Sequence, residues 1–139
     1  MSSPRCVVDT NVLISAGLFR DRGPRRLVEW VIRYGTLLAS EETVKEFRSR
    51  FVGRDKFDRY LPKESREEFV VEVIEDSEVV AVTTRLALCR DPDDDRFAEL
   101  ALDGAADVVV TGNTRDFPAD IRGIPVVTPA AFVERYVGR

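Results

Sequence analysis

The sequence predicts an α/β fold with a mostly parallel sheet. Short apolar runs rich in β-branched residues recur along the chain, and segments with helical spacing of apolar residues lie between them. This alternation is typical of parallel sheets, because a parallel strand pair needs a crossover connection. The 139 residues contain no repeat, linker-like stretch or break in composition, so we expect a single domain spanning residues 1–139.

Five strands are expected from the apolar runs. They lie at residues 5–9 (RCVVD), 36–40 (TLLAS), 78–82 (EVVAV), 107–111 (DVVVT) and 124–128 (IPVVT). The fourth is the clearest, because it is continuous and β-branched and is followed by the turn-forming pair Gly112-Asn113.

Helices are expected between these strands. They lie at residues 24–34, from 41 to about 51, over 55–75 with a break near Leu61-Pro62, directly after residues 91–95, and from Pro129 to about 137. Pro24 suits the first turn of the first helix. Ser40 is suited to cap the second, whose first-turn Glu41 and Glu42 are favoured by the helix dipole.

The composition excludes several kinds of chemistry. The chain has no histidine, which removes Ser-His-Asp and Cys-His catalysis and most zinc and copper sites. Its two cysteines, Cys6 and Cys89, lie far apart and have no metal-type spacing. A metal ion would have to be bound by oxygen, which favours magnesium or manganese.

The same composition predicts a soluble, cytoplasmic protein. The chain lacks a run of about 18 apolar residues that could span a membrane, and its N-terminus leads into a strand without room for a signal peptide. The net charge of -4 argues against strong non-specific nucleic-acid binding. Arginines clustered at 20–26 and 48–59 could still contact an anionic substrate, although a solvated surface of mixed charge is the simpler interpretation.

Acidic residues gather where predicted strands end. Asp9, followed by Thr10 and Asn11, ends the first strand, and Asp116 lies shortly after the fourth. Four of the five residues from 91 to 95 are aspartates, in CRDPDDDRF, just before the helix that leads to the fourth strand. Because ligands bind beyond the carboxyl ends of parallel strands, we expect these acids and Glu46 to converge there.

Each of these acids also has a structural interpretation. Asp9 could cap a turn, Glu46 could pair with Arg50 four residues later, and the aspartates at 93–95 could be first-turn acids of a helix. The case for a site therefore depends on convergence. Crowded carboxylates need a counter-charge, which a divalent cation supplies, and such a site can hydrolyse a phosphodiester without histidine.

The chain resembles the PIN-domain ribonucleases, in particular the toxin components of type II toxin-antitoxin pairs. CVVDTNVLISA is similar to the first motif of the family, LLASEETVKEF to the second, and DPDDDRFAELALDGAADVVVTGNTRDF to the third and fourth run together. The resemblance covers nearly the whole chain. It implies a PIN-like fold with three layers, α/β/α, around the central sheet.

The resemblance also implies the site residues. The catalytic set is Asp9, Glu46, Asp94 and Asp116, and the residues that would bind Mg²⁺ or Mn²⁺ are Asp9, Asp94 and Asp116. Asp94 is assigned by counting back seven residues from Ala101 in the small-residue helix. Many members carry an aspartate directly after Thr-Gly, where this chain has Asn113, so Asp116 is taken to supply that charge. The residues expected to orient these ligands or a water are Thr10, Asn11, Ser40 and Asn113.

The implied activity is metal-dependent endoribonuclease cleavage of RNA by a toxin. A homodimer and a small antitoxin protein as inhibitor are implied as partners, with no membrane association. Candidate contacts to RNA phosphates are Arg20, Arg25, Arg26, Arg50 and Arg54, as salt-sensitive anchors rather than base readers.

Three other interpretations differ at specific residues. A receiver-type signalling domain would need a lysine at the end of a late strand, whereas the lysines of this chain are Lys45, Lys56 and Lys63. A haloacid-dehalogenase-type phosphatase has Asp-x-Asp after its first strand, and here the third position is Asn11. A catalytically degenerate PIN-like module that binds RNA or a protein partner is compatible with Asn113, and metal-dependent cleavage would distinguish it from an enzyme.

Overall fold

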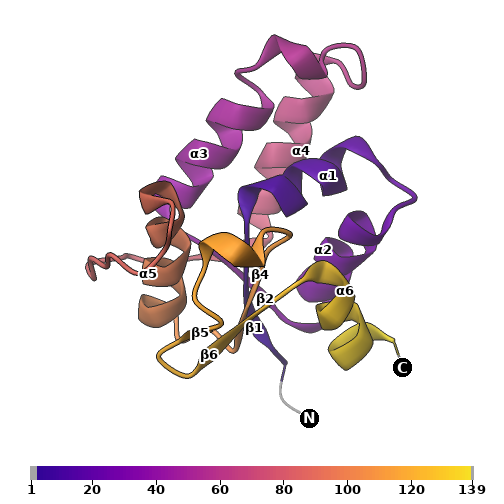
Figure 1. The fold of residues 1–139 in the computed structure, drawn as a ribbon. Coiled ribbons are helices and arrows are strands. Elements are labelled where there is room, and N and C mark those ends of the chain that lie inside the picture. Colours follow the sequence, from indigo (N-terminus) through magenta and orange to yellow (C-terminus); the bar gives the residue numbers. More distant parts are fainter. Residues whose placement is uncertain (1–2, 139) are drawn as a thin grey trace.

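A six-stranded sheet forms the centre of the computed structural model, which describes residues 3–138 (Figure 1). Its strands are β1 (Arg5–Val8), β2 (Thr36–Ala39), β3 (Ser77–Val79), β4 (Val108–Val110), β5 (Asp120–Ile121) and β6 (Ile124–Val127). Their spatial order is β3-β2-β1-β4-β6-β5, and every neighbouring pair is parallel except the β5–β6 hairpin. The expected mostly parallel sheet is confirmed.

The strand order reverses between β1 and β4. From β1 the chain runs outward through β2 and β3, and it then returns to place β4 on the other side of β1. Val8 pairs with Val110 in register, so the two strands end side by side. Such a reversal opens a crevice at the carboxyl ends of the strands, which is where α/β folds bind ligands.

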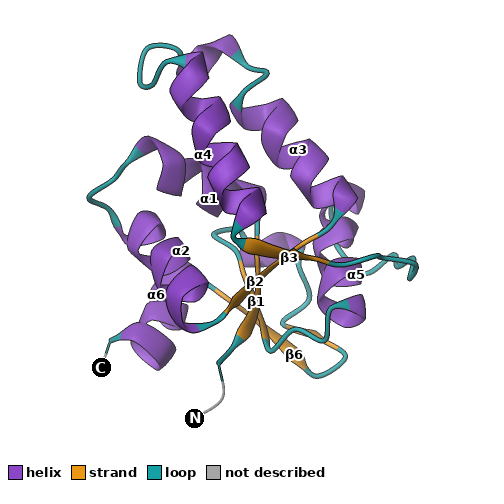
Figure 2. Ribbon diagram, turned by 180° about the vertical axis from the view of Figure 1, so that it is seen from behind, coloured by secondary structure: helices purple, strands orange, loops and turns teal. Residues whose placement is uncertain are grey.

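Helices cover both faces of the sheet, which gives the three layers expected. They are α1 (Thr10–Leu18), α2 (Gly23–Tyr34), α3 (Glu41–Phe51), α4 (Lys63–Glu75), α5 (Asp95–Asp103) and α6 (Pro129–Phe132), the last continuing as a π-helical turn at Val133–Val137. Helix α5 lies on one face and the others lie on the opposite side (Figures 1 and 2). None of the helices within residues 3–138 is both long and apolar enough to cross a membrane.

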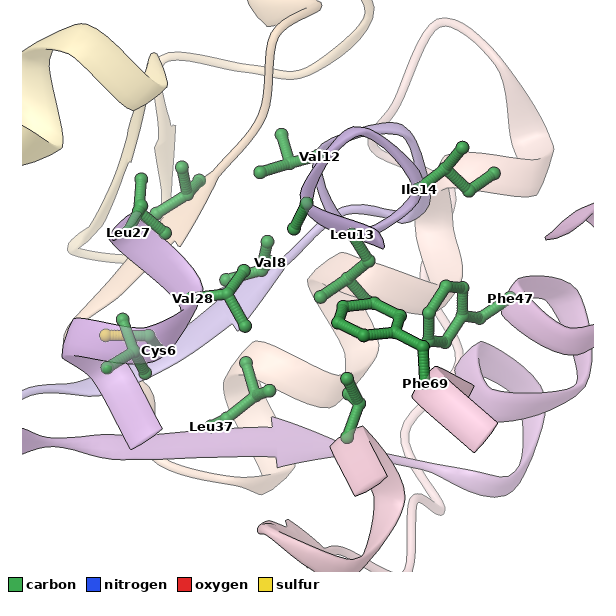
Figure 3. Packing of buried hydrophobic residues seen from close by; sticks show 14 of the residues in the cluster. Cys6, Val8, Val12, Leu13, Ile14, Leu27, Val28, Leu37, Phe47 and Phe69 are labelled. Carbon is green, nitrogen blue, oxygen red and sulfur yellow. The ribbon is translucent and has the colours of Figure 1, made fainter. Parts of the chain in front are cut away.

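Alternation along the strands builds two hydrophobic cores. Cys6 and Val8 of β1 face the core shared with α1–α4 and α6, part of which is drawn in Figure 3. Val7, between them, faces the core under α5. The same alternation separates Leu37 from Leu38. Side chains that point to opposite faces at every second residue are what a buried central strand requires.

Helices α3 and α4 lie side by side and project beyond the sheet (Figures 1 and 2). Phe47 and Phe51 of α3 stack and meet Phe69 of α4 edge-on. Helix α1 approaches this pair closely at Gly17, where a Cβ atom would lie 2.7 Å from the Phe51 ring. Glycine is therefore required there by packing.

Three parts of the sequence-based expectation were wrong or incomplete. Helix α1 was not expected, because its residues are buried on most sides and show no amphipathic spacing. Strand β5 was also missed. The strand expected at 78–82 ends at Val79.

Side chains of α5 bind the backbone of the segment that follows β3. Asp103 accepts hydrogen bonds from the Thr83 and Thr84 amides at 2.7 and 3.0 Å, and Glu99 accepts one from the Leu86 amide at 2.8 Å. Asp95 continues the row four residues before Glu99. These carboxylates supply acceptors for backbone amides of this segment.

Candidate active site

Asp9 lies at the end of β1, at the sheet reversal, with 7% of its surface exposed. Its Oδ1 accepts a hydrogen bond from the Val12 amide at 3.0 Å and caps α1. Its Oδ2 accepts a hydrogen bond from the Thr111 hydroxyl at the end of β4. Burial raises the pKa of Asp9, and the Thr111 and backbone hydrogen bonds oppose that shift. The carboxylate is therefore fixed in orientation although burial disfavours its charge.

The four aspartates between residues 91 and 95, just before and at the start of α5, make different contacts. Asp91 accepts the Asp93 amide at 3.0 Å and caps the short 3₁₀ turn Pro92–Asp94. Asp95 is buried and accepts the Leu88 and Cys89 amides at 3.0 and 2.8 Å. Asp93 is exposed and lies 3.5 Å from Arg96. Asp94 is the member of this run whose pKa the charges of the other acids raise.

Asp94 is the point at which the acidic side chains converge. Burial is the largest cause that raises its pKa to about 6, and the negative charges of Asp91, Asp116, Asp9 and Glu46 raise it further. These residues come from β1, α3 and the segments on either side of β4. Acids from separate segments of the chain therefore lie close enough to one another to raise the pKa of Asp94.

Glu46, in the middle of α3, is buried between two arginines. Arg50 lies 3.2 Å from its Oε1 and Arg96 lies 3.0 Å from its Oε2. The second contact is an ion pair by distance, and Oε2 has no hydrogen-bond partner within residues 3–138. The expected Glu46–Arg50 pair is present, but it is half-buried rather than a surface pair. Sequence analysis missed Arg96.

Asn113 and Asp116 form a pair on the loop after β4. The Asn113 side-chain amide donates to an Asp116 carboxylate oxygen, and the Asn113 backbone amide donates to the Thr111 hydroxyl at 3.0 Å. Thr111 thus links this loop to Asp9, and sequence analysis missed it as well. Its place at the last position of the expected strand was the signal that could have identified it.

The remaining expected supporting residues differ in what they contact. Ser40 caps α3 by accepting the Thr43 amide at 3.2 Å, which is the structural alternative considered for it. Thr10 is buried and its hydroxyl has no hydrogen-bond partner within residues 3–138. Asn11 is exposed, and its backbone amide lowers the pKa of Asp9.

The arginines expected to contact RNA differ in their exposure and in their contacts. Arg20, Arg26 and Arg54 are exposed. Arg25 donates to the Ala16 carbonyl at 3.2 Å and lies over the Phe69 ring, so it also supports the packing of α2 on α4. Arg50 contacts Glu46 at 3.2 Å, and its charge lowers the pKa of Asp9.

The side chains gathered at this end of the sheet offer carboxylate and amide oxygens, which are the types of ligand that a hard divalent cation prefers. The side chains are not pre-assembled, however. Within residues 3–138, no three acidic or cysteine side chains are arranged so that they could hold an ion as they stand. Glu46 is turned to its arginines and Asp116 to Asn113. Binding would require Asp94 and Asp116 to turn toward Asp9.

The fold and this edge define a class of protein, an α/β domain with a histidine-free group of carboxylates at the reversal point of a parallel sheet. Residues 5–115 match the PIN domain family, and the chain belongs to that family. The fold is similar to that of a chain in the crystal structure of VapBC2 from Rickettsia felis bound to a DNA fragment from their promoter. That likeness has a TM-score of 0.65 and 15% identity and covers 89% of this chain and 98% of the other. No curated protein matches the sequence significantly.

Proposed function

We propose that this protein is a metal-dependent endoribonuclease. The observation that carries the proposal is the convergence of negative charge on Asp94, whose pKa burial and four other acids raise to about 6. At neutral pH this group of acids lacks a sufficient counter-charge, which a divalent cation would supply. Membership of the PIN domain family, whose members are generally nucleases, supports the same conclusion.

The proposed ligands are Asp9, Asp94 and Asp116, with Mg²⁺ or Mn²⁺ as the ion. When bound, the ion supplies an acidified water and stabilises negative charge on the phosphate. Asp9 is held by Val12 and Thr111 and needs no reorientation. Glu46 keeps Arg50 and Arg96 beside the acids, where the two guanidinium groups limit the repulsion between carboxylates.

The biological setting is part of the proposal. We propose that residues 1–139 act as a single PIN domain and that the protein is the toxin of a toxin-antitoxin pair. A cognate antitoxin, a homodimer and action in the cytoplasm belong to the same proposal. Support comes from the similarity in fold to a chain of the VapBC2 structure. The sequence identity of 15% supports the likeness of the fold and nothing further. Growth arrest on expression, relieved by co-expression of a neighbouring small gene, would test the toxin assignment.

Asp94→Asn is expected to lower RNA cleavage by at least 10–100-fold. That is about the loss on removing an outer partner of a metal ligand, and a ligand should matter no less. Purified protein would be assayed on a mixed RNA pool with magnesium, with manganese and with chelator. Asp93→Asn is the matched control, because Asp93 is the adjacent exposed aspartate and its carboxylate lies 3.5 Å from Arg96. It should cleave at nearly the wild-type rate.

Two outcomes would contradict the proposal. Cleavage that survives both chelator and Asp94→Asn would mean another site or a contaminating nuclease. A folded protein that cuts nothing in manganese would favour the alternative, a degenerate PIN module that binds RNA or a protein without cleavage. The observation that favours this alternative is Asn113, which brings no charge to a group of acids that is not pre-assembled.

Asn113→Asp is expected to tighten Mn²⁺ binding about tenfold, because cation affinity rises with the number of charged ligands. The substitution replaces the amide that donates to Asp116 with a second carboxylate. Calorimetric titration with Mn²⁺ measures the effect directly. Asp93→Asn again serves as the control, and unchanged affinity in Asn113→Asp would place residue 113 outside the ion's reach.

A further inference from the structure

A pocket of about 350 Å³ lies directly against Asp9. Its walls come from the start of α1, the start of α2, the loop after β4 and the start of α6, and the labels α1, β4 and α6 in Figure 1 locate three of these segments. The lining residues are Asp9, Asn11, Val12, Ser15, Pro24, Gly112, Asn113 and Pro129. The volume lies within the range of about 300–1,000 Å³ common for small-molecule sites.

The chemistry of the lining fits a nucleobase. Val12, Pro24 and Pro129 offer apolar surface to the faces of a ring, while the amides and hydroxyl of Asn11, Ser15 and Asn113 offer donors and acceptors to its edge. Among residues 3–138, no arginine or lysine lines the pocket, so the lining is poorly suited to a phosphate. Proteins that recognise RNA by sequence read the edges of unstacked bases in this manner.

A second, larger pocket fits RNA less well. It measures about 420 Å³ and is lined by residues that include Glu41, Glu42 and Glu99. Its arginines are already paired: Arg85 lies 3.5 Å from Glu42 and 3.7 Å from Glu99, and Arg96 pairs with Glu46. Excess acid with no free cation would repel a polyanion. The pocket beside Asp9 is therefore the better place for part of the substrate.

We propose that the pocket beside Asp9 receives one unpaired base of the RNA, adjacent to the phosphate that is cut. The inference rests on the proposed function and deepens it by assigning a subsite for one base. Asp9 belongs both to the pocket wall and to the acidic group, so a base in the pocket places its own phosphate at the acids. A base inside a duplex must first be unpaired and unstacked, which opposes its entry into the pocket.

Gly112→Leu tests the pocket, because a Cβ atom at Gly112 meets no atom within 4 Å and the added side chain enters open space. Binding of a labelled single-stranded RNA is measured by fluorescence anisotropy in chelator, where cleavage is absent, beside the duplex of the same sequence. Wild-type protein should bind the single strand about tenfold tighter than the duplex, because only an unpaired base can enter the pocket. Gly112→Leu should remove that difference.

Two further variants complete the experiment. Ala87→Leu adds the same bulk on an exposed loop and should leave both affinities unchanged. Asn11→Ala removes one exposed amide of the pocket and should weaken only single-strand binding. Equal single-strand affinity for wild type and Gly112→Leu would overturn the inference even if the protein cuts RNA. Pocket-dependent binding without any cleavage in manganese would support the pocket and overturn the proposed nuclease.

Discussion

Arg66→Met is expected to lower the free energy of unfolding by about 3–5 kcal/mol, the range seen when one partner of a buried charge network is removed. Arg66 is fully buried beneath the connection between α3 and α4. Its guanidinium donates to the carbonyls of Phe51 and Arg54 at 2.8 and 3.4 Å and also contacts those of Leu61 and Val52. Methionine would fill much of the volume and leave these acceptors without a donor.

Asp58→Asn provides the control for Arg66→Met. The Asp58 carboxylate contacts Arg66 at 2.9 Å, but it is exposed, so the loss of its charge should cost less than about 1 kcal/mol. Urea unfolding of the two variants measures both effects as shifts in midpoint at constant slope. If the two variants lost equal stability, the ion pair rather than the buried carbonyls would be the important contact.

The fold could largely be predicted because its signals are local. Strands such as β4 are continuous β-branched runs, and α3 carries both its cap and its apolar stripe in the sequence. Helix α1 was not predicted, because a helix buried on most sides has no polar face and its sequence therefore shows no amphipathic periodicity. The β5–β6 hairpin was not predicted from the sequence. Its turn places Arg122 at a φ of 49°, which a non-glycine residue seldom adopts.

The candidate site could be predicted only where a residue type was unusual for its position. Asp9 directly after an apolar strand and four aspartates in five positions are such cases. Arg66 and Arg96 lie in ordinary charged stretches, and their partners are distant in sequence. One signal was available for Arg66, which precedes Phe69 and Val70 by three and four residues and therefore lies on the buried face of α4.

Asp9→Asn is expected to reduce cleavage by about 10²–10³-fold, the loss typical of removing one group that stabilises charge in a transition state. Asparagine keeps an oxygen for the Val12 amide and can still hydrogen-bond Thr111, so the cap of α1 should persist. What is lost is the negative charge at the centre of the acidic edge. Metal-dependent cleavage of RNA measures the effect on function.

The same substitution should not destabilise the metal-free protein. Burial raises the pKa of Asp9 above its ordinary value of 3.8, so the folded state binds its proton more tightly than the unfolded state. The ionised carboxylate therefore costs stability once the pH exceeds about 3.8, and the cost grows until the pH passes the raised pKa. In chelator at pH 7, Asp9→Asn should unfold at or above the wild-type temperature, and this advantage should disappear near pH 3.

Adding Mn²⁺ should reverse the order of stability. An ion that binds only the folded state stabilises wild type by about 2.7 kcal/mol at a concentration one hundred times its Kd, while Asp9→Asn should gain far less. Thermal unfolding in chelator and in manganese separates the two contributions without relying on activity. If both proteins were stabilised equally by manganese, Asp9 would not be a metal ligand, and any loss of cleavage would have to come from substrate placement in the adjoining pocket.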